Sequence, residues 1–546
     1  MQLCEYKGEV RFLKYPIKCT SIGFMAGVLI TASLLTGFDK GANVEVSDQN
    51  LNLQILSIND FHGQIDKSGK ANDKVTGTAE YLATHLKHRE AQNKNTLLVH
   101  AGDVVGASSP ASALLQDEPT IDILNKLNFD VGTVGNHEFD EGLTELKRII
   151  DGGYHPKTGF FKGANFPYIV ANVLDKKTKK PILPPHAIKV VEGVKIGFIG
   201  VVTQTTPSVV TPEGIKDVIF SDEAEAINQQ VKELKKQGVK AIMVLAHEGG
   251  LQDSTTGKIT GPIADITQKL DPEVDVVFAG HSHTYLNGTV DGKMIVQAGS
   301  YGNAFADVDV VVNKRTKDVV KKSSEIVYTY HEGITPDSRT HEIVEKAKAK
   351  VAPIISKEVA KSSGIITRAE NTSGESALGN FIADSQRWKM STDFAFMNPG
   401  GIRADMPSGK VTWGDLFTIQ PFGNDLISMK LTGEQIRKVL NQQFQDPNRV
   451  RMLQISGLTY KWDSTRPTDN RVYNLKKSDG TEIDLAKHYT VTTNYFLATG
   501  GDDFTEFVNG THRTIGPTDL DGLVEYVKQL PQPFHAKIEG RITKVN

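Results

Sequence analysis

The stretch DVGTVGNHEFD (residues 130–140) ends a short apolar run with a cluster of polar side chains. The run stops at Gly135, and Asn136, His137 and Asp140 follow within one tight turn. One polar turn after a strand is common in loops. The stretch therefore points to a site only if other strands of the chain end in the same way.

Four further apolar segments do end in the same way. LSINDFHG, LLVHAGDVVG, VLAHEGG and VVFAGHSHTY each place carboxylate or imidazole groups directly after a predicted strand, namely Asp60, His62, Asp103, His247, His281 and His283. Binding sites of open α/β sheets form outside the carboxyl ends of their strands. A single histidine there is usually structural, but five such strand ends are not expected by chance. We therefore expect these side chains, with Asn136, to converge on one crevice.

The ligand types indicate a pair of metal ions. Seven candidates are too many for one tetrahedral ion, and one carboxylate, most naturally Asp103, could bridge two ions ~3.5–4 Å apart. Mixed imidazole and carboxylate ligands suit Zn, Mn, Fe or Co. Both cysteines, Cys4 and Cys19, precede the predicted folded region, so thiolates are excluded as ligands. Four histidines lack a strand-end setting and are predicted to be structural: His85, His88, His100 and His155.

The chain has 546 residues, a formal net charge of -3 and 39% hydrophobic residues, which is ordinary globular composition for two or more domains. It has no basic excess, so no nucleic-acid polymer is expected as a partner. The sequence predicts no oligomeric state. Basic residues followed by the apolar run of residues 21–37 predict a secretory signal, or an anchor if it is not cleaved. We expect a periplasmic, cell-surface or secreted protein that touches a membrane only through this segment.

Alternating apolar runs and amphipathic segments predict an α/β fold before residue 315. One helix is expected at residues 221–238 with Ser221 as its N-cap, and a helical linker at residues 335–361 is expected to be interrupted at Pro353. A mixed α+β domain follows, with predicted strands that include residues 453–462 and 488–498 and a capping box from Thr432 to Gln435. The predicted parts are a signal or anchor (1–45), an α/β domain (46–330), the linker (331–362) and a C-terminal domain (363–546).

The order D-x-H, G-D, G-N-H-E-x-D, H, G-H-x-H resembles that of the calcineurin-like metallophosphoesterases. With the C-terminal domain, residues 51–545 resemble secreted bacterial 5′-nucleotidases, which include UDP-sugar hydrolases and 2′,3′-cyclic phosphodiesterases. The resemblance implies a β-sandwich flanked by helices and a C-terminal substrate-binding domain. It implies one metal held by Asp60, His62, Asp103 and His283, and a second held by Asp103, Asn136, His247 and His281. It also makes His137, oriented by Asp140, the catalytic group.

Phosphate ester chemistry is consistent with these roles. Two divalent cations neutralise the ester's negative charge and lower the pKa of bound water, which gives a hydroxide nucleophile. Charge that develops on the phosphoryl oxygens then needs a further positive donor, and His137 held protonated by Asp140 can supply it. We therefore expect an enzyme that releases phosphate from nucleoside 5′-monophosphates.

Three segments of the C-terminal domain are typical of a nucleotide site: NPGGIRAD, QPFGND and NYFLATGGDDF. Two aromatic rings could hold a nucleobase between them. By the resemblance, Arg403 contacts phosphate, Phe422 and Phe496 stack on the base, Asn424 hydrogen-bonds to it and Asp502 holds the ribose. The glycines of the site are Gly500 and Gly501, and Asn136 is expected to face the substrate as well as a metal.

One departure from the family pattern widens the substrate range. Many of these nucleotidases carry an additional arginine where this chain has Gly374. Cyclic nucleotides and nucleotide sugars therefore remain alternative substrates. A sulfur-containing anion is disfavoured by the expected base-stacking residues. A surface binding protein without activity is disfavoured because binding alone would not require both His137 and Asp140.

Overall fold

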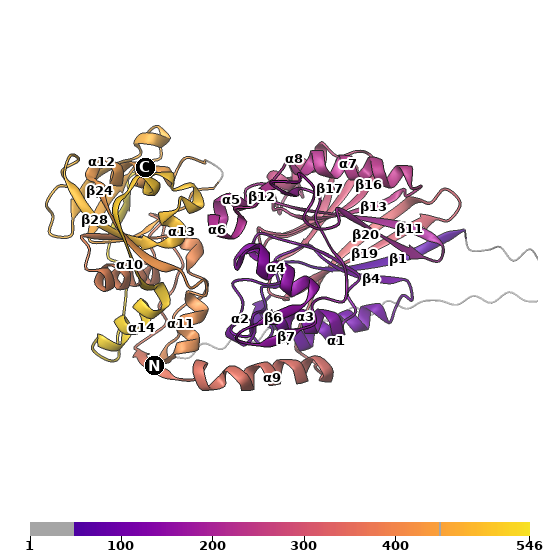
Figure 1. Ribbon diagram of the computed structural model, residues 1–546, viewed down its shortest axis with the longest axis horizontal. Helices are drawn as coiled ribbons and strands as arrows, with labels where there is room; N and C mark the ends of the chain where they lie inside the picture. The colour runs from indigo at the N-terminus through magenta and orange to yellow at the C-terminus, as the bar shows by residue number, and fades with distance from the viewer. Residues whose placement is uncertain (1–48, 447–448) are drawn as a thin grey trace, which may run out of the picture. The chain divides into compact units, whose positions relative to one another are not determined.

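The computed structural model describes residues 49–446 and 449–546, and the predicted signal or anchor at residues 1–45 lies outside them. Among the described residues, no helix combines the length and the apolar character that a membrane span requires. Residues 49 to about 330 build two packed sheets with helices outside them, and the chain after the linker builds a separate sheet with its own core (Figure 1).

Each of the two packed sheets has six strands, four of which are parallel. The first sheet has the order β20 (Asp318–Tyr328), β19 (Ala304–Asn313), β1 (Asn50–Ile58), β4 (Thr96–His100), β5 (Val131–Thr133), β8 (Tyr168–Ile169). The second has the order β10 (His186–Val191), β11 (Val194–Val202), β13 (Ala241–His247), β16 (Val274–Ala279), β18 (Lys293–Ala298), β17 (Tyr285–Val290). Strands β1, β4, β5 and β8 run parallel, as do β11, β13, β16 and β18. The carboxyl ends of each parallel set therefore lie at one edge of its sheet.

The central strands are buried on both faces, which explains their nearly continuous apolar sequences. Along β1, Leu53 and Ile55 pack between the two sheets, while Leu56 and Ile58 face the outer helices. Helices α1 (Ala79–Glu90) and α3 (Glu118–Lys126) cover the first sheet, and α9 (Ser338–Ile355) packs against these two helices. Helices α7 (Glu223–Lys236) and α8 (Pro262–Gln268) cover the second sheet (Figure 1). This arrangement confirms the predicted α/β class and the β-sandwich.

Two local predictions in this domain are wrong. Helix α7 is capped by Asp222, whose carboxylate accepts a hydrogen bond from the Glu225 N–H at 2.8 Å, and not by Ser221. Ser221 is instead bonded to the Asn172 carbonyl through both its N–H and its hydroxyl. The linker helix α9 is not interrupted at Pro353 but continues for two residues to Ile355. Its apolar face packs against the first domain.

The C-terminal domain is α+β, as predicted. Its main sheet has the order β25 (Gln454–Ser456), β22 (Phe394–Met397), β28 (His488–Asn494), β24 (Asp425–Thr432), β29 (Thr511–Thr518). A smaller sheet has the order β27 (Val472–Lys477), β26 (Leu458–Trp462), β30 (Ile542–Lys544). Pairing of β21 (Glu358–Ser362) with β23 (Gly409–Thr412) forms a further ribbon. The helices include α10 (Ala377–Met390), α11 (Trp413–Ile419), α12 (Gly433–Gln442), α13 (Tyr495–Ala498) and α14 (Asp519–Gln529).

The predicted capping box of α12 is confirmed. The Thr432 hydroxyl accepts from the Gln435 N–H at 3.2 Å, and the Gln435 side chain accepts from the Thr432 N–H at 2.9 Å. Two predicted strands are corrected. Residues 453–462 form two strands that separate at Gly457, where φ is +85°, and residues 488–498 change from strand to helix after Asn494. The Asn494 side chain caps the helix that follows, so the break places Phe496 on α13.

Candidate metal and nucleotide site

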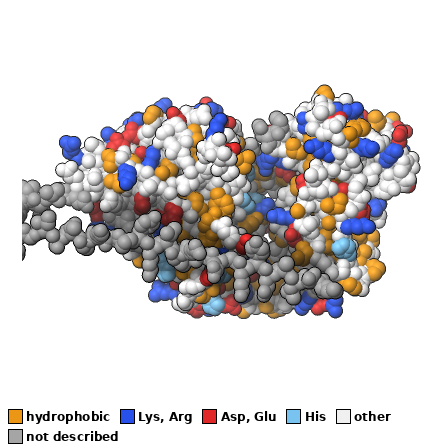
Figure 2. Space-filling view, turned by 180° about the vertical axis from the view of Figure 1, so that it is seen from behind, with side chains coloured by type: hydrophobic (Ala, Val, Ile, Leu, Met, Phe, Trp, Pro, Cys, Tyr) orange, Lys and Arg blue, Asp and Glu red, His pale blue; other side chains and the backbone are white. Residues whose placement is uncertain are grey.

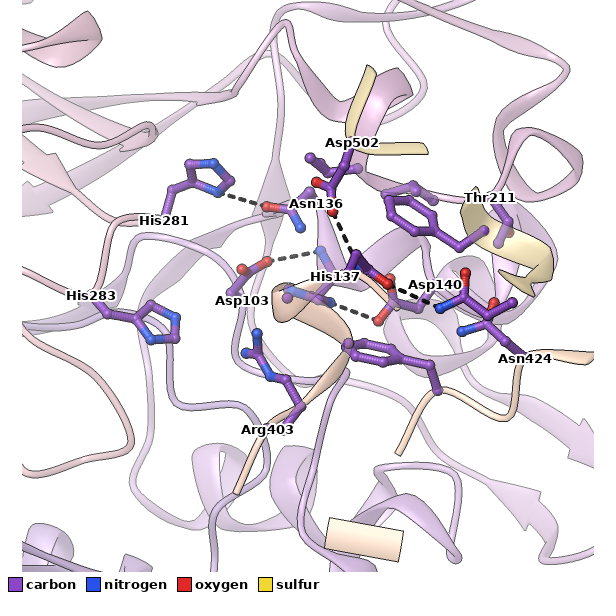
Figure 3. Close-up of a pocket in the computed structure, with 18 of the residues that line it drawn as sticks. Asp103, Asn136, His137, Asp140, Thr211, His281, His283, Arg403, Asn424 and Asp502 are labelled. Carbon is purple, nitrogen blue, oxygen red and sulfur yellow. Dashed lines mark hydrogen bonds and ion pairs between the residues drawn. The ribbon is translucent and has the colours of Figure 1, made fainter. Parts of the chain in front are cut away.

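The strand ends picked out from the sequence converge on one place. The Asp60 and His62 amides bond to carbonyls of the loop that carries Asp103, which joins the ends of β1 and β4. The His281 N–H, after β16 of the other sheet, donates to both Asp60 oxygens at 3.0 Å. Figure 3 shows Asp103, Asn136 and His281 directed toward one another, with His283 at the same side. The two sheet edges thus form one site.

The first group of side chains surrounds His62. Its Nε2 lies 3.1 Å from His283 Nε2, 3.7 Å from Asp103 Oδ2 and 3.9 Å from Asp60 Oδ1. His283 Nε2 lies 3.3 Å from Asp60 Oδ1. These atoms belong to the four residues that the resemblance assigns to one metal. The Asp60, His62 and His283 ligand atoms all lie within 4.8 Å of one another.

The second group shares Asp103 with the first. His247 Nε2 lies 3.0 Å from Asp103 Oδ2, and His281 Nδ1 lies 2.9 Å from Asn136 Oδ1. Ligand atoms of Asp103, His247 and His281 lie within 4.8 Å of one another. Because both groups share Asp103, its carboxylate could serve as a ligand to two ions.

The electrostatics of these groups fit cations. His62 Nδ1 lies 2.8 Å from the Gly106 carbonyl and donates to it. Burial, opposed by Asp103, holds the pKa of His62 well below its usual range, so the ring is neutral and its Nε2 carries a lone pair. That lone pair faces Asp103 and another imidazole nitrogen at distances that are unfavourable without a positive charge between them. His247 lies in the same field, where carboxylates led by Asp103 outweigh burial and raise its pKa to about 10. The surroundings of His62 and of His247 therefore both favour a positive charge at the ligand atoms, and divalent cations would supply it.

Backbone strain is concentrated at the same residues. Five of the seven expected ligands have positive φ: Asp60 at 50°, His62 at 51°, Asp103 at 48°, His281 at 69° and His283 at 56°. Non-glycine residues rarely adopt this region, and such strain persists only where the surrounding structure enforces it. The tight turns after the strands aim these side chains into the shared site.

A buried carboxylate that the sequence left without a role supports these turns. Glu138 accepts hydrogen bonds from the Asp103 N–H at 2.9 Å and the Val104 N–H at 2.8 Å, and also from the Gly135 N–H. Burial, with the nearby Asp103 charge, raises the pKa of Glu138 to about 7. The position of Glu138 in the G-N-H-E motif could have indicated from the sequence that it supports the site. Glu138 joins the loops after β4 and β5.

His137 and Asp140 form the expected pair. His137 Nδ1 lies 2.7 Å from Asp140 Oδ2, and the His137 N–H donates to Asp103 Oδ1 at 2.9 Å. Burial lowers the pKa of His137, but the Asp140 and Asp103 carboxylates outweigh it, so the pKa lies above its ordinary value. The His137 and His62 ring centroids lie 4.9 Å apart with their planes at 74°. The pair can therefore hold a proton beside the first group of ligands.

A cavity of about 350 Å³ opens over these residues and includes side chains from the C-terminal domain. The predicted substrate residues that line it are Asn136, Arg403, Phe422, Asn424, Phe496 and Asp502, and Gly400 and Gly401 of the NPGGIRAD segment line it as well. Around a hollow in the face shown in Figure 2, histidine side chains lie near lysine or arginine side chains. Gly500 and Gly501 do not line the cavity. A Cβ on Gly501 would lie 2.5 Å from the Phe496 ring, so this glycine supports the ring from behind.

Sequence reasoning missed several lining residues. Asn398 lies inside the quoted NPGGIRAD segment and donates to Asp502 Oδ2 at 3.0 Å, and Asn494 donates to Asn398 at 3.0 Å. Arg449 and Thr211 also line the cavity, and no motif marked either of them. The Phe422 ring lies nearly parallel to the His137 ring, at 5.8 Å between centroids and 17° between planes.

Comparison with known proteins agrees with this geometry. Residues 53–285 match the family model for calcineurin-like phosphoesterases, and residues 356–509 match that for the 5′-nucleotidase C-terminal domain. The chain is 37% identical over 563 residues to Cell wall protein Lmo0130 of Listeria monocytogenes, an alignment that covers 94% of this chain and 71% of that protein. The chain belongs to the 5′-nucleotidase family of calcineurin-like phosphoesterases.

Two further proteins that are similar to this chain agree with the family assignment. The chain is 47% identical over 500 residues to Endonuclease YhcR of Bacillus subtilis, which covers 90% of this chain but 41% of that protein, so it spans less than half of that relative. The crystal structure of a 5′-nucleotidase precursor from Thermus thermophilus matches with a TM-score of 0.78 and 27% identity, covering 91% of this chain and all of that one. As a 5′-nucleotidase family member the chain is a phosphoric ester hydrolase, and calcineurin-like phosphoesterases use divalent metals.

At Gly374, where the resemblance leads us to expect an arginine, the backbone and its surroundings favour glycine. Gly374 has a φ of +89°, and a Cβ there would lie 2.5 Å from the Met452 side chain, so no larger residue fits without rearrangement. Arg368, close to it in sequence, donates to the Ile402 carbonyl at 2.8 Å and lines a different cavity. Arg449, on another loop, contributes a cationic side chain to the lining of the cavity of about 350 Å³.

Proposed function

We propose that this phosphohydrolase releases phosphate from nucleoside 5′-monophosphates with two divalent cations. One observation supports the substrate class above the others. The same cavity is lined by candidate metal ligands and by two phenylalanines beside a buried carboxylate, Asp502. A phosphate beside the metals would leave a nucleoside within reach of these rings.

The metal assignment follows the two groups of side chains. Asp60, His62, Asp103 and His283 would hold one cation, and Asp103, Asn136, His247 and His281 would hold the other. When bound, the cations neutralise the phosphate oxygens and lower the pKa of water toward neutrality. Zn, Mn, Fe and Co suit this mixture of imidazole and carboxylate ligands.

In this proposal His137 acts on the phosphoryl group. Its Nδ1 is tied to Asp140 at 2.7 Å, which leaves Nε2 for the substrate. A proton held at Nε2 stabilises charge that develops on a phosphoryl oxygen, or reaches the departing nucleoside oxygen. Asp140 orients the ring and, with Asp103 and against the effect of burial, raises the pKa of His137, which favours the protonated imidazolium.

The remaining residues position the nucleotide. Arg403 offers its guanidinium to the phosphate, Phe422 and Phe496 hold the base by stacking, Asn424 bonds the base edge and Asp502 accepts a ribose hydroxyl. Asn136 lies between the metal ligands and the substrate-binding residues, and it would contact both a metal and the substrate. Gly500 and Gly501 shape the turn that presents Asp502, whose φ is 55°.

A second candidate keeps the site and changes the ester. The absence of an arginine at Gly374 and the presence of Arg449 in the cavity favour a wider substrate range, such as 2′,3′-cyclic nucleotides or UDP-sugars. The name of the relative YhcR adds a polynucleotide phosphodiester as a further substrate to test. We place the enzyme outside the cytoplasm, as a cell-surface or secreted protein. The predicted N-terminal signal and the name of the cell wall relative support this location.

A substrate screen tests the proposal. Protein reconstituted with Zn or Mn is incubated with AMP, ATP, UDP-glucose, 2′,3′-cyclic AMP and a short single-stranded DNA, and the products of each are separated and quantified by chromatography. We expect AMP to give the largest kcat/KM. A metal-loaded enzyme that cleaves p-nitrophenyl phosphate but prefers another ester over AMP would refute the monophosphate assignment while leaving the phosphohydrolase intact.

A further inference from the structure

A second cavity, of about 240 Å³, lies beside the site on the other side of Arg403. Its lining comes from the loops after β1 and β4, from the turn before β19 and from the segment around α11. The residues are Gln64, Lys67, Ser68, Gly69, Ala107, Ser108, Tyr301, Asn303, Arg403, Ala404 and Thr418. None of the nucleotide-stacking residues belongs to it, so the proposed nucleoside site leaves this space unused.

The chemistry of this lining selects for an anion. It includes two cationic side chains, four hydroxyl groups and two amides, and no aspartate or glutamate. Lys67 and Arg403 make no ion pair with any residue in the described ranges 49–446 and 449–546. Arg403 Nε is buried and has no hydrogen-bond partner within those ranges. A buried donor without a partner is costly, and an anionic ligand in either of the two cavities that Arg403 lines would satisfy it.

The second cavity adjoins the reacting centre through two residues. Arg403 lines both cavities. Tyr301, whose φ of 61° is unusual for a bulky residue, turns its ring to 5.2 Å from the His283 ring and 5.7 Å from the His62 ring. Tyr301 therefore belongs to the lining that includes Lys67 and also contacts two of the candidate metal ligands. A group bound beside Lys67 would lie next to the phosphoryl site and apart from Phe422 and Phe496.

We propose that this cavity is a second phosphate subsite, with Lys67 as its specificity-determining cation. It takes a phosphoryl group that is not the one undergoing hydrolysis. Such a group has two sources, the inorganic phosphate that hydrolysis releases and the second phosphate of a nucleoside diphosphate. The subsite rests on the established phosphohydrolase fold, and only its use by a diphosphate rests on the proposed nucleotide substrate.

The test uses Lys67→Gln in the full metal-loaded chain, with Lys70→Gln as the matched control. Lys67 and Lys70 are both exposed and lie close together in sequence, but Lys70 does not line the cavity. Two quantities are measured in each protein. The first is inhibition of p-nitrophenyl phosphate hydrolysis by inorganic phosphate, and the second is the ratio of kcat/KM for ADP to that for AMP.

We expect Lys67→Gln to leave kcat for p-nitrophenyl phosphate unchanged. Loss of one exposed charge contact should weaken phosphate binding at this subsite by about 5-fold, the upper end for an exposed ion pair. A weaker noncompetitive component of phosphate inhibition identifies product phosphate as the ligand. A lower ADP to AMP ratio identifies the second phosphate of a substrate.

The proposal is overturned if Lys67→Gln changes neither quantity, or if Lys70→Gln changes them equally, which would indicate a general effect of surface charge. The measurement of inhibition by inorganic phosphate uses no nucleotide. Failure of AMP as a substrate would therefore contradict the proposed function without deciding the fate of the subsite.

Discussion

Replacement of Gly501 by alanine tests the nucleotide site without removing an aromatic ring. The new Cβ would lie 2.5 Å from two carbons of the Phe496 ring. Carbon atoms pack favourably at about 3.5–4.0 Å, so the ring must move by about 1 Å. Because Phe496 lines the cavity and Gly501 does not, the Cβ pushes the ring into the space proposed for the base.

The magnitude follows from the stacking energy. Stacking of a base on an aromatic ring contributes about 1–3 kcal/mol, so its loss should lower kcat/KM for AMP by about 5- to 150-fold. p-Nitrophenyl phosphate has no nucleobase and should be hydrolysed nearly as well as by the wild type. Gly364→Ala is the matched control, because its Cβ would meet no atom within 4 Å and its backbone is unstrained.

Steady-state kinetics of both substrates in the three proteins decides the matter. Equal losses on AMP and p-nitrophenyl phosphate would show that Phe496 supports the domain rather than the base. No loss on either substrate would show that the nucleobase binds elsewhere. Thermal unfolding of each variant establishes that the protein compared is folded.

Three further predictions concern the metal site, the catalytic pair and pH. Asp103→Asn should lower the metal content below about two ions per chain and abolish activity, because one carboxylate serves both cations; elemental analysis showing full occupancy in the variant would contradict the shared ligand. His137→Asn should keep the metal content and lower kcat by about 10²–10⁴, and loss of metal instead would make His137 a ligand. Burial raises the pKa of Asp519 to about 8, so the folded state holds a proton that the unfolded state releases near pH 4. Stability should therefore fall as pH rises from about 5 to 8 and be flatter in Asp519→Asn, as measured by denaturant unfolding; parallel curves for the two proteins would show that Asp519 carries no such proton.

The fold class and the position of the ligand-bearing turns follow from local patterns in the sequence. Continuous apolar runs that alternate with amphipathic segments require a sheet buried on both faces, and β1 and β13 are such strands. The side chains after them are polar because the carboxyl ends of parallel strands meet at one edge. Local rules also predicted the Thr432 capping box, since its bonds join residues three apart.

Local rules failed where a distant residue competed. Ser221 has the composition of an N-cap, but Asn172 occupies its hydrogen bonds and Asp222 caps α7 instead. Pro353 does not end α9, because it lies close to a terminus that packing against the first domain already holds. In both cases the deciding partner is far away in the sequence.

The arrangement of the site residues relative to one another depends on the folded chain. Positive φ at His62 and Asp103 is unfavourable locally and is enforced by packing of one loop against another. No motif marks Arg449, and none shows that Lys67 and Arg403 share a cavity without carboxylates. Spacing along the chain specifies which groups follow a strand. Electrostatic environment and cavity shape depend on segments hundreds of residues apart, and these arise only when the chain has folded.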